Sequence, residues 1–463
     1  MLFNSYVFLL AFLPTAIAIY WFADKSKHWR TWVLIALSLV FYSYWDVRFL
    51  PIMVGSILLN WWAAGIYAIF KRHLIITAAI VANLAILGIF KYANFFADNL
   101  AAILDVLPPR FQIALPLGIS FFTFHHIMYL VDLGRGKAPI YPLDKYALYI
   151  CFFPQALAGP IARWDEVVHQ FGERAFAPGW QRRCVLGVTF VVIGLVQKVF
   201  LGDPLESAVN AVYQNASVDP LLDGSAWIGV LGFPFQVFFD FSGYSDIAVG
   251  LALLFGIRLP INFDAPFRAT SLQSFWQRWH ITLMRFLRDY VYRYLRDYVY
   301  IRLGGSRYKL SRRIAATTAT MTLCGLWHGA GWNFVIWGTV QGIGLSIAVL
   351  WGTAFPPLPK RLGWALTIAF FILTLNIFRA QSFEVCMRMY EGLLVSPDLR
   401  QSGVRVLTVA MFAAIALPPS HAICERLTSS PRLVVACVLA LAFLAVLVSI
   451  GSPGNYEFYY FQF

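Results

Sequence analysis

The chain is predicted to be an all-α polytopic membrane protein. Hydrophobic residues make up 60% of its 463 residues, charged residues only 13%, and the mean hydropathy is +0.67. This composition is typical of membrane proteins and not of soluble domains. At roughly 20 residues per span, the apolar stretches leave room for about ten or eleven spanning or re-entrant helices. We expect them to form a single transmembrane domain over residues 1–463.

The charged residues indicate orientation in the membrane. The net charge is +13, but most basic residues lie in short loops between apolar segments, where they mark the cytoplasmic side. The charge therefore does not predict nucleic-acid binding. The six cysteines are scattered, without metal-ligand spacing, so we expect no disulfide framework, no metal site and no bound cofactor.

The first three spans predict the topology. The run at about 4–23 has no basic segment before it and continues past a weak cleavage motif, so we expect an uncleaved helix. Spans near 31–45 and 50–70 follow. Basic clusters come after the first span and after the third, at 25–30 and 71–72. Because both clusters fall on one side, that side is predicted to be cytoplasmic and the N-terminus external.

Three interrupted segments follow the span near 74–91. Residues 93–107 carry two aspartates among apolar residues, which predicts a helix at the membrane interface. A broken helix is predicted at 115–132, where a proline and a glycine interrupt an apolar run that also holds two adjacent histidines. Residues 152–163 contain two prolines, and a re-entrant or surface segment fits them better than a spanning helix.

Acidic residues are prominent between two further spans, near 184–201 and 233–257. The loop between these spans carries Asp203 and Glu206 but no basic residue, which predicts an external position. Asp240 lies inside the second span. Because a carboxylate at the centre of a membrane costs about 2.5–3.5 kcal/mol on insertion scales, we expect Asp240 to line a cavity.

Residues 258–313 form the longest polar excursion. They include eleven arginines and are predicted to be a cytoplasmic amphipathic segment. Trp276, Trp279, His280 and Met284 recur at three- and four-residue spacing, which predicts a helix with His280 on or beside its apolar face. A lone histidine at such a position is more often a packed core residue than a catalyst.

The same segment contains a tandem octad. Residues 286–293 are followed by a near copy at 294–301. Eight residues turn an α-helix by about 800°, so equivalent side chains of the two copies point about 80° apart. The second copy therefore need not repeat the contacts of the first.

A second histidine lies in the helical segment predicted at 314–352. His328 follows Trp327 and precedes Gly329 within an apolar run. Imidazole is costly in hydrocarbon unless it faces a cavity or a partner, and glycines allow a backbone or ligand to approach closely. This pattern fits a functional histidine and a structural histidine bonded across a helix interface equally well. Three further spans and an aromatic tail are predicted at 362–379, 404–418, 432–451 and 456–463.

Several short motifs occur in a specific order along nearly the whole chain. They are PLGISFFTF at 116–124, FFPQ at 152–155, AGPI at 158–161, DFSGYSD at 240–246, FWQRWH at 275–280, LGG at 303–305, WHG at 327–329 and YFQF at 460–463. Each motif alone is weak. Together they resemble the membrane-bound O-acyltransferase family, and within it a bacterial branch similar to the alginate O-acetyltransferase membrane subunit.

The resemblance implies a set of site residues. His328 matches the histidine regarded as catalytic, and His280 matches a second histidine that faces the same site from the cytoplasmic side. Other residues in these motifs or close to them are then expected to support the site or line a tunnel: Asp240, Tyr244, Trp327, Gly329 and Asn333. The chain departs from the family pattern at the doubled octad and at Arg302, where proline is usual.

The chemistry expected from the resemblance is acyl transfer to a hydroxyl group. His328 would act as general base, because an alcohol is a poor nucleophile until it loses its proton. The donor would be acetyl-CoA, with its phosphates near the arginines of 258–313. The acceptor side would be a periplasmic partner that O-acetylates an alginate- or cellulose-like exopolysaccharide within a biosynthesis and export complex. The protein would lie in the lipid of the bacterial inner membrane, with both termini periplasmic.

Two other functional classes are compatible with parts of the sequence. Intramembrane histidines and aspartates also occur in proton-coupled transporters, and a non-catalytic scaffold of a polysaccharide export complex would share the composition. No inverted pair of interrupted helices is evident in corresponding halves, which argues against the transporter. Direct acetylation of the polymer or of peptidoglycan is a further alternative.

Overall fold

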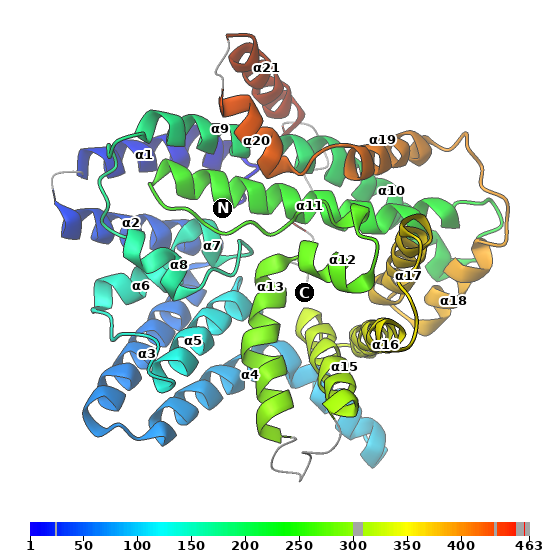
Figure 1. Cartoon of the computed structure of the whole chain (residues 1–463), viewed down its shortest axis with the longest axis horizontal. Helices are drawn as coiled ribbons and strands as arrows, with labels where there is room; N and C mark the ends of the chain where they lie inside the picture. The colour runs from blue at the N-terminus through cyan, green and yellow to red at the C-terminus, as the bar shows by residue number, and fades with distance from the viewer. Residues whose placement is uncertain (24–25, 300–308, 430–432, 451–457, 459–463) are drawn as a thin grey trace. The chain divides into compact units, whose positions relative to one another are not determined.

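The computed structural model describes residues 1–23, 26–299, 309–429, 433–450 and 458. Within these residues every regular element is a helix (Figure 1), which confirms the predicted all-α class. Arg302, the LGG motif, the end of the tandem octad and the tail apart from Phe458 lie outside the described residues.

Seven of the described helices are long and apolar enough to cross a membrane, and a bent pair makes an eighth if it counts as one span. The protein is therefore a multi-pass membrane protein, while the predicted number of ten or eleven spanning or re-entrant helices stays a prediction. The candidate spans are Val47–Phe70, His73–Leu104, Trp180–Val218, Ala226–Leu254, Trp332–Ala354, Lys360–Arg379 and Leu433–Ile450, with Gly403–Ala416 and Ser420–Ser429 as the bent pair.

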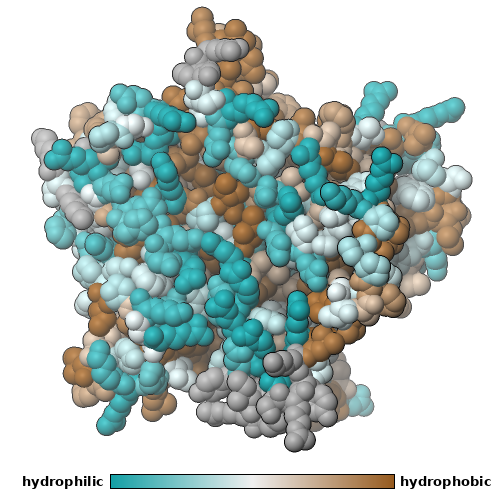
Figure 2. Space-filling view, in the orientation of Figure 1, coloured by the Kyte–Doolittle hydropathy of each residue, from teal (hydrophilic) through white to brown (hydrophobic). Residues whose placement is uncertain are grey.

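The spans differ in how much protein surrounds them. Helix α11 (Ala226–Leu254) is fully buried within the protein along its apolar window, whereas only 11% of the window of α21 (Leu433–Ile450) is buried. Hydrophobic side chains cover α21 in the space-filling view (Figure 2). A helix that is apolar all round needs either protein or lipid on every side, so α11 is a core helix and α21 is suited to lipid.

The described chain divides into two compact units. Unit 1 comprises Met1–Ile193, Tyr244–Ile261 and Cys424–Leu441, and unit 2 comprises Gly194–Gly243, Asn262–Ile423 and Ala442–Phe463. Helix α11 contributes its first part to unit 2 and its last part to unit 1. The prediction of one transmembrane domain over 1–463 stays a prediction.

Unit 1 holds the N-terminal helices. They are η1 (Val7–Phe12), α1 (Leu13–Phe22), α2 (Lys27–Ser43), η3 (Val47–Phe49), α3 (Leu50–Phe70), α4 (His73–Leu104), α5 (Ile119–Gly134), α6 (Leu143–Cys151), α7 (Phe153–Ala156), α8 (Trp164–Val167), η4 (Val168–Gln170) and most of α9 (Trp180–Gln197). Buried amides of α3 and α4 pair with each other, because the Asn60 and Asn83 side chains exchange hydrogen bonds of 3.1 and 2.7 Å. Such pairs satisfy polar groups where lipid cannot.

Two segments of unit 1 differ from their predicted form. The predicted interfacial helix at 93–107 is the second half of the 32-residue helix α4, which continues without a break to Leu104. No proline occurs between His73 and Leu104, so the helix has no reason to end at the predicted boundary. Residues 152–162 are buried and contain only the short helix α7, so the surface alternative is wrong and the re-entrant alternative stays a prediction.

Unit 2 holds the remaining helices. They are η5 (Lys198–Gly202), α10 (Asp203–Val218), η6 (Pro266–Arg268), α12 (Leu272–Arg278), α13 (Ile281–Phe286), η7 (Leu287–Tyr292), η8 (Leu295–Val299), α15 (Lys309–His328), α16 (Trp332–Ala354), α17 (Lys360–Arg379), α18 (Phe383–Gly392) and α19 (Ser402–Ala416); the units share α20 (Ser420–Ser429) and α21. The octad copies both adopt π-helical turns, η7 and η8. Their common sequence therefore produces the same local structure.

The segment predicted as a loop after residue 201 is helical up to Val218, so its predicted form is wrong, while its external position stays a prediction. Helix α10 follows directly on η5, and together with α9 they form a 39-residue candidate span from Trp180 to Val218. Asp203 and Glu206 are therefore buried helical residues, exposed by 9% and 2%. The prediction relied on the absence of basic residues after residue 201. It did not consider that a carboxylate can be buried beside a basic residue earlier in the chain, as Asp203 is beside Lys198 at 2.6 Å.

The predicted continuous amphipathic helix around His280 is also wrong. Helix α12 ends at Arg278 and α13 begins at Ile281, and His280 between them has a left-handed backbone conformation with φ of 44°. A non-glycine residue with this φ is uncommon and marks a constrained position. The backbone N–H of Ile281 donates to the Asn262 carbonyl at 2.9 Å, which holds the break in place.

The segment predicted at 314–352 forms the hairpin of α15 and α16, which lie beside each other in Figure 1. The two helices cross closely at Gly325 and Gly338. A methyl group added at either glycine would lie 2.9 Å from the Cα of the other. Small residues allow membrane helices to approach at such distances, so these glycines determine how tightly the hairpin closes.

Replacing Gly338 with valine is expected to destabilise this hairpin. Side chains forced into a filled interface cost about 1–3 kcal/mol, so Gly338→Val should lower the thermal unfolding midpoint of the detergent-purified protein. Gly352→Val on the same helix is the control, because nothing lies within 4 Å of an added methyl group there. Equal midpoints for Gly338→Val and wild type would contradict the role of the crossing.

Candidate active site

His328 is the last residue of α15 and lies in an aromatic cage. The residue is only 6% exposed. The rings of Trp327, Trp337 and Phe378 contact the imidazole edge to face, with centroid distances of 4.7, 5.6 and 5.3 Å. These rings come from α15, α16 and α17, so the hairpin and the following helix enclose the imidazole together. Water is largely excluded from such a site, which strengthens the electrostatic interactions inside it.

His280 lies near the same cage and contacts its Trp327 ring. The Trp327 indole lies 4.7 Å from the His328 ring and 6.5 Å from the His280 ring, measured between centroids. Phe241 of α11 contacts the His280 ring edge to face at 4.6 Å. Both predicted histidines thus contact the predicted Trp327 within unit 2, although they are 48 residues apart in the sequence.

Asn262 orients the His280 ring. Its side-chain oxygen Oδ1 lies 3.2 Å from Nδ1 of His280 and accepts hydrogen bonds from Thr282, at 3.2 Å from the backbone N–H and 2.7 Å from the hydroxyl. An oxygen that accepts these bonds requires Nδ1 to carry the proton, which assigns the lone pair to Nε2. His280 is 1% exposed, and burial lowers its pKa to about 3. It is therefore neutral at physiological pH.

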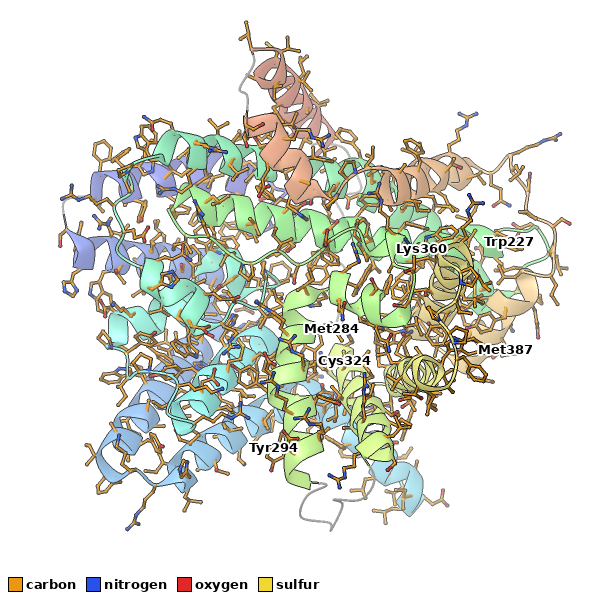
Figure 3. All side chains as sticks on the ribbon, viewed as in Figure 1. Trp227, Met284, Tyr294, Cys324, Lys360 and Met387 are labelled. Carbon is orange, nitrogen blue, oxygen red and sulfur yellow. The ribbon has the colours of Figure 1, made fainter. Side chains whose placement is uncertain are left out.

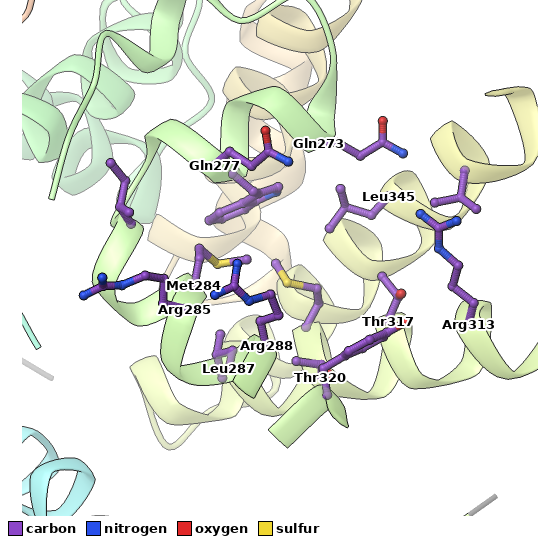
Figure 4. A pocket seen from close by; sticks show the side chains of 15 residues that line it. Gln273, Gln277, Met284, Arg285, Leu287, Arg288, Arg313, Thr317, Thr320 and Leu345 are labelled. Carbon is purple, nitrogen blue, oxygen red and sulfur yellow. The ribbon is translucent and has the colours of Figure 1, made fainter. Parts of the chain in front are cut away.

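A cavity of about 480 Å³ opens next to the histidine cage (Figure 4). Helices α12 and α13 with η7 form one side, and α15 and α16 form the other. In Figure 3, Met284 marks α13 and Cys324 marks α15, the helices on the two sides of the cavity. The cavity is lined by Gln273, Trp276, Gln277, Ile281, Met284, Arg285, Leu287, Arg288, Tyr292, Arg313, Thr317, Thr320, Met321, Leu345 and Val349.

This cavity combines cationic and apolar walls. Arg285 and Arg288 come from one side and Arg313 from the other (Figure 4). Trp276 links the cavity to the cage, because its ring lies 6.1 Å from Trp337, which contacts His328. Arginine side chains bind phosphates in bidentate geometry. The cavity can therefore hold a phosphorylated ligand with its apolar part directed toward the histidines.

Two predicted site residues act on the cage through its neighbours. Asn333 donates hydrogen bonds to the Phe378 carbonyl at 3.1 Å and to the Ala380 carbonyl at 3.4 Å, which ties the start of α16 to the end of α17. Gly329 faces the Phe334 ring, whose Cζ would lie 2.6 Å from an added methyl group. Both residues shape the cage instead of touching the His328 ring.

Asp240 forms a buried ion cluster beyond the cage. Lys198 pairs with Asp240 and, at 2.6 Å, with Asp203. Lys198 is 4% exposed and Asp240 only 1%. Asp240 was expected to line a cavity, and its pairing with Lys198 was not expected. A lysine inside an apolar run was the available signal, since a buried ammonium needs a carboxylate partner.

Tyr244 belongs to a different compact unit from the two histidines. It belongs to unit 1, where its ring stacks on Phe3 at 4.8 Å. His328, His280, Asp240, Trp327, Gly329 and Asn333 all belong to unit 2. The structure thus gathers six of the seven predicted residues in one unit, and the role of each in the site stays a prediction.

The protonation of His280 has a measurable consequence. Its pKa of about 3 lies below the ordinary value of 6.5, so between these values the unfolded chain binds a proton that the folded chain does not. Stability therefore falls as the pH falls from about 6.5 toward 3, by about 1.4 kcal/mol per pH unit from this residue. His280→Asn, which suits the left-handed backbone and does not titrate, should show a smaller drop in unfolding midpoint between pH 7.5 and 5.0.

The exposed His169 provides the control for this measurement. His169→Ala should keep the full drop of the wild-type protein. An identical drop in His280→Asn would mean that His280 is protonated in the folded protein at pH 5.

Comparison with known proteins connects this arrangement to a family. The family model of membrane-bound O-acyltransferases matches residues 7–390. The probable alginate O-acetylase AlgI of Pseudomonas aeruginosa is 37% identical over 407 residues, which cover 85% of this chain and 75% of that protein. The peptidoglycan O-acetyltransferase of Helicobacter pylori is 35% identical over 432 residues, covering 85% and 80%. The teichoic acid D-alanyltransferase of Bacillus subtilis is 27% identical over 246 residues, covering 51% and 59%.

These matches extend over most of the chain and include the part that carries both histidines. They favour the acyltransferase over the transporter and the scaffold that the composition also allowed. The chain belongs to the membrane-bound O-acyltransferase family and is an O-acyltransferase.

Proposed function

We propose that this O-acyltransferase takes an acetyl group from acetyl-CoA and supplies it for O-acetylation of an extracellular polysaccharide of the alginate or cellulose type. The enclosure of His328 beside the arginine-lined cavity is the observation that carries this proposal. The similarity to proteins named alginate O-acetylase supports the polysaccharide as acceptor. A periplasmic partner within the polysaccharide export complex would complete the transfer.

His328 is the proposed general base. It would remove the proton from the acceptor hydroxyl, whose oxygen then attacks the carbonyl carbon of the thioester. As the C–O bond forms, the C–S bond breaks, and the proton passes from the imidazole to the sulfur of the departing CoA. The aromatic cage supports this role, because its three rings surround the imidazole and largely exclude water from it.

His280 is proposed to position the reactants. Its Nδ1–H is committed to Asn262 and burial keeps the ring neutral, so Nε2 can accept a hydrogen bond but the ring supplies no positive charge. The contact of both histidines with Trp327 favours a shared site for the thioester and the hydroxyl.

The arginine-lined cavity is the proposed donor site. Arg285, Arg288 and Arg313 would bind the phosphates of acetyl-CoA, while Trp276 and Met321 contact the pantetheine arm that leads to the cage. Acetyl-CoA is made in the cytoplasm, so we place this end of the protein on the cytoplasmic side of the inner membrane. Both termini would then be periplasmic, as the basic loop residues indicate.

The first test is the acetyl ester content of exported polysaccharide. Cells carrying His328→Ala should export the polymer without acetyl esters, because the rings of the cage cannot take the proton from the hydroxyl and His280, with its pKa lowered to about 3, is a weak base. Cells carrying the wild-type protein or His169→Ala at the same membrane level should retain the esters, since His169 is exposed and far from the cage in sequence. Persistence of esters with His328→Ala would make His328 a structural residue.

The donor site is tested with two thioesters of different charge. Arg313 is exposed at the cavity and has no carboxylate partner among the described residues. Arg313→Gln should raise the KM for acetyl-CoA about tenfold, the loss expected for one charge-assisted hydrogen bond worth about 1.5 kcal/mol. It should leave the KM for the phosphate-free acetyl-N-acetylcysteamine unchanged.

Arg361→Gln is the control for this comparison, because Arg361 is exposed but does not line the cavity. Its KM for both thioesters should equal the wild-type value. An equal rise of both KM values in Arg313→Gln would indicate general damage to the cavity and not loss of phosphate binding.

A further inference from the structure

Trp276 connects the arginine-lined cavity to the histidine cage. It lines the cavity, and its ring lies 6.1 Å from that of Trp337, which in turn lies 5.6 Å from the imidazole of His328. A thioester whose phosphates bind at the cavity arginines therefore has the Trp276 indole beside it on the way to His328.

Two of the described polar side chains that line this cavity are buried. They are Trp276 and Thr320, each 5% exposed. The Thr320 hydroxyl donates to the Ala316 carbonyl within α15, at 2.6 Å. The indole nitrogen Nε1 of Trp276 has no hydrogen-bond partner among the described residues. The buried part of the cavity wall thus holds one polar group that the fold leaves unpaired.

An unpaired indole N–H has a definite chemical requirement. It donates one hydrogen bond and accepts none, and a buried donor without an acceptor costs about 1–3 kcal/mol. An acyl thioester of CoA offers carbonyl oxygens as acceptors, one on the acyl group and others on the pantetheine amides. The contact of Trp276 with Trp337 favours the acyl carbonyl, because this carbonyl has to lie next to His328 for the reaction.

The Trp276 ring is fixed by neighbouring aromatic rings. It packs edge to face against Phe275, Trp337 and Phe371, with centroid distances of 5.7, 6.1 and 6.3 Å. A donor that is held in place before the reaction and shielded from water stabilises a developing negative charge most effectively, since nothing has to reorganise. Trp276 has both properties.

Other donors near the cage are less suited to this carbonyl. His280 uses its one N–H, on Nδ1, for the hydrogen bond of 3.2 Å with Asn262. His328 is assigned to the acceptor hydroxyl. Trp337 also has an unpaired indole nitrogen among the described residues, but it does not line the cavity. Trp276 is therefore the residue at the end of the cavity that can bind the acyl carbonyl.

We propose that the indole N–H of Trp276 binds the carbonyl oxygen of the acetyl thioester and stabilises the negative charge that this oxygen acquires during transfer. When the hydroxyl oxygen attacks the carbonyl carbon, the π electrons of the C=O bond move to the carbonyl oxygen. When the C–S bond breaks, the C=O bond forms again and the indole keeps its proton. Trp276 is thus a catalytic residue, and this inference rests on the proposed function.

The test replaces Trp276 by benzothienylalanine, which has nearly the shape of tryptophan but carries sulfur in place of the indole N–H. Release of CoA from acetyl-CoA is measured in inside-out membrane vesicles of cells whose polysaccharide esters depend on this protein, so that the native acceptor is present. Removing one oxyanion donor costs roughly 10²–10³ in kcat. We expect kcat to fall about a hundredfold and the KM for acetyl-CoA to change less than threefold.

Trp364 provides the matched control. Its indole N–H donates to the Phe267 carbonyl at 2.8 Å, so it has a partner within the protein, and it does not line the cavity. The same replacement at Trp364 removes a structural hydrogen bond and should leave kcat and KM within twofold of the wild-type values at the same membrane level.

An infrared measurement tests the hydrogen bond without turnover. The purified protein binds an inert analogue of acetyl-CoA in which CH₂ replaces the sulfur and the ketone carbonyl is isotope-labelled. Because a hydrogen bond lowers the stretching frequency of a carbonyl, the band should move to a higher wavenumber with benzothienylalanine at 276 and stay in place with benzothienylalanine at 364. An unchanged band in a 276 variant that binds the analogue would overturn the proposal.

The kinetic outcomes separate this inference from the proposed function. Equal CoA release by wild-type vesicles and by His328→Ala vesicles would refute the proposed function itself. Release that depends on His328 but has an unchanged kcat in the Trp276 variant would refute only this inference. A higher KM with unchanged kcat would assign the Trp276 N–H to the pantetheine arm and overturn its catalytic role.

Discussion

The close crossing of α15 and α16 is the contact on which the site depends. Without side chains at Gly325 and Gly338, the two backbones meet directly. The chain can then reverse within three residues after His328, and Trp337 of α16 comes to lie against the imidazole at 5.6 Å. A bulkier crossing would separate α15 from α16 and open the cage. The position of His328 thus follows from two residues that take no part in its chemistry.

A second constraint is that polar groups in this fold must find partners inside the protein. Asn262 shows how this requirement also sets chemistry, because its one oxygen satisfies Thr282 and at the same time assigns the tautomer of His280. The left-handed backbone at His280 costs conformational energy. The hydrogen bonds to Asn262 hold the residue in this conformation, so the strain and the orientation of the ring have one cause.

Composition and apolar run length were sufficient to predict a helical multi-pass protein, because the hydrophobic requirement of a bilayer acts on every span alike. His328 could also be found from the sequence, since an imidazole among tryptophans and glycines stands out. The predictions were wrong where a residue's structure depends on a partner that is distant or unrecognised in the sequence. Asp203 and Glu206 look like loop residues until Lys198 is placed beside Asp203, and no spacing rule predicts the π-helical turn that begins at Lys198.

The break at His280 was missed for a related reason. The spacing of Trp276, Trp279 and Met284 suits a helix, and only Asn262, eighteen residues earlier, overrides it. Trp337 and Phe378 likewise could not be predicted as site residues, because they contact His328 only through the packing of α16 and α17. Arginines such as Arg313 were predicted as markers of membrane orientation, and their arrangement around one cavity required the fold.

The separation of charge from the imidazole explains how one unit can combine these features. A base must be neutral before it takes a proton, and carboxylates next to a histidine would hold it protonated. In unit 2 the ion cluster of Lys198 and Asp240 is offset from His328 by the ring contacts from Phe233 through Phe378. The cavity arginines reach the cage only through Trp276 and Trp337. Aromatic rings therefore serve both to exclude water from the proposed base and to keep the charged groups of unit 2 away from it.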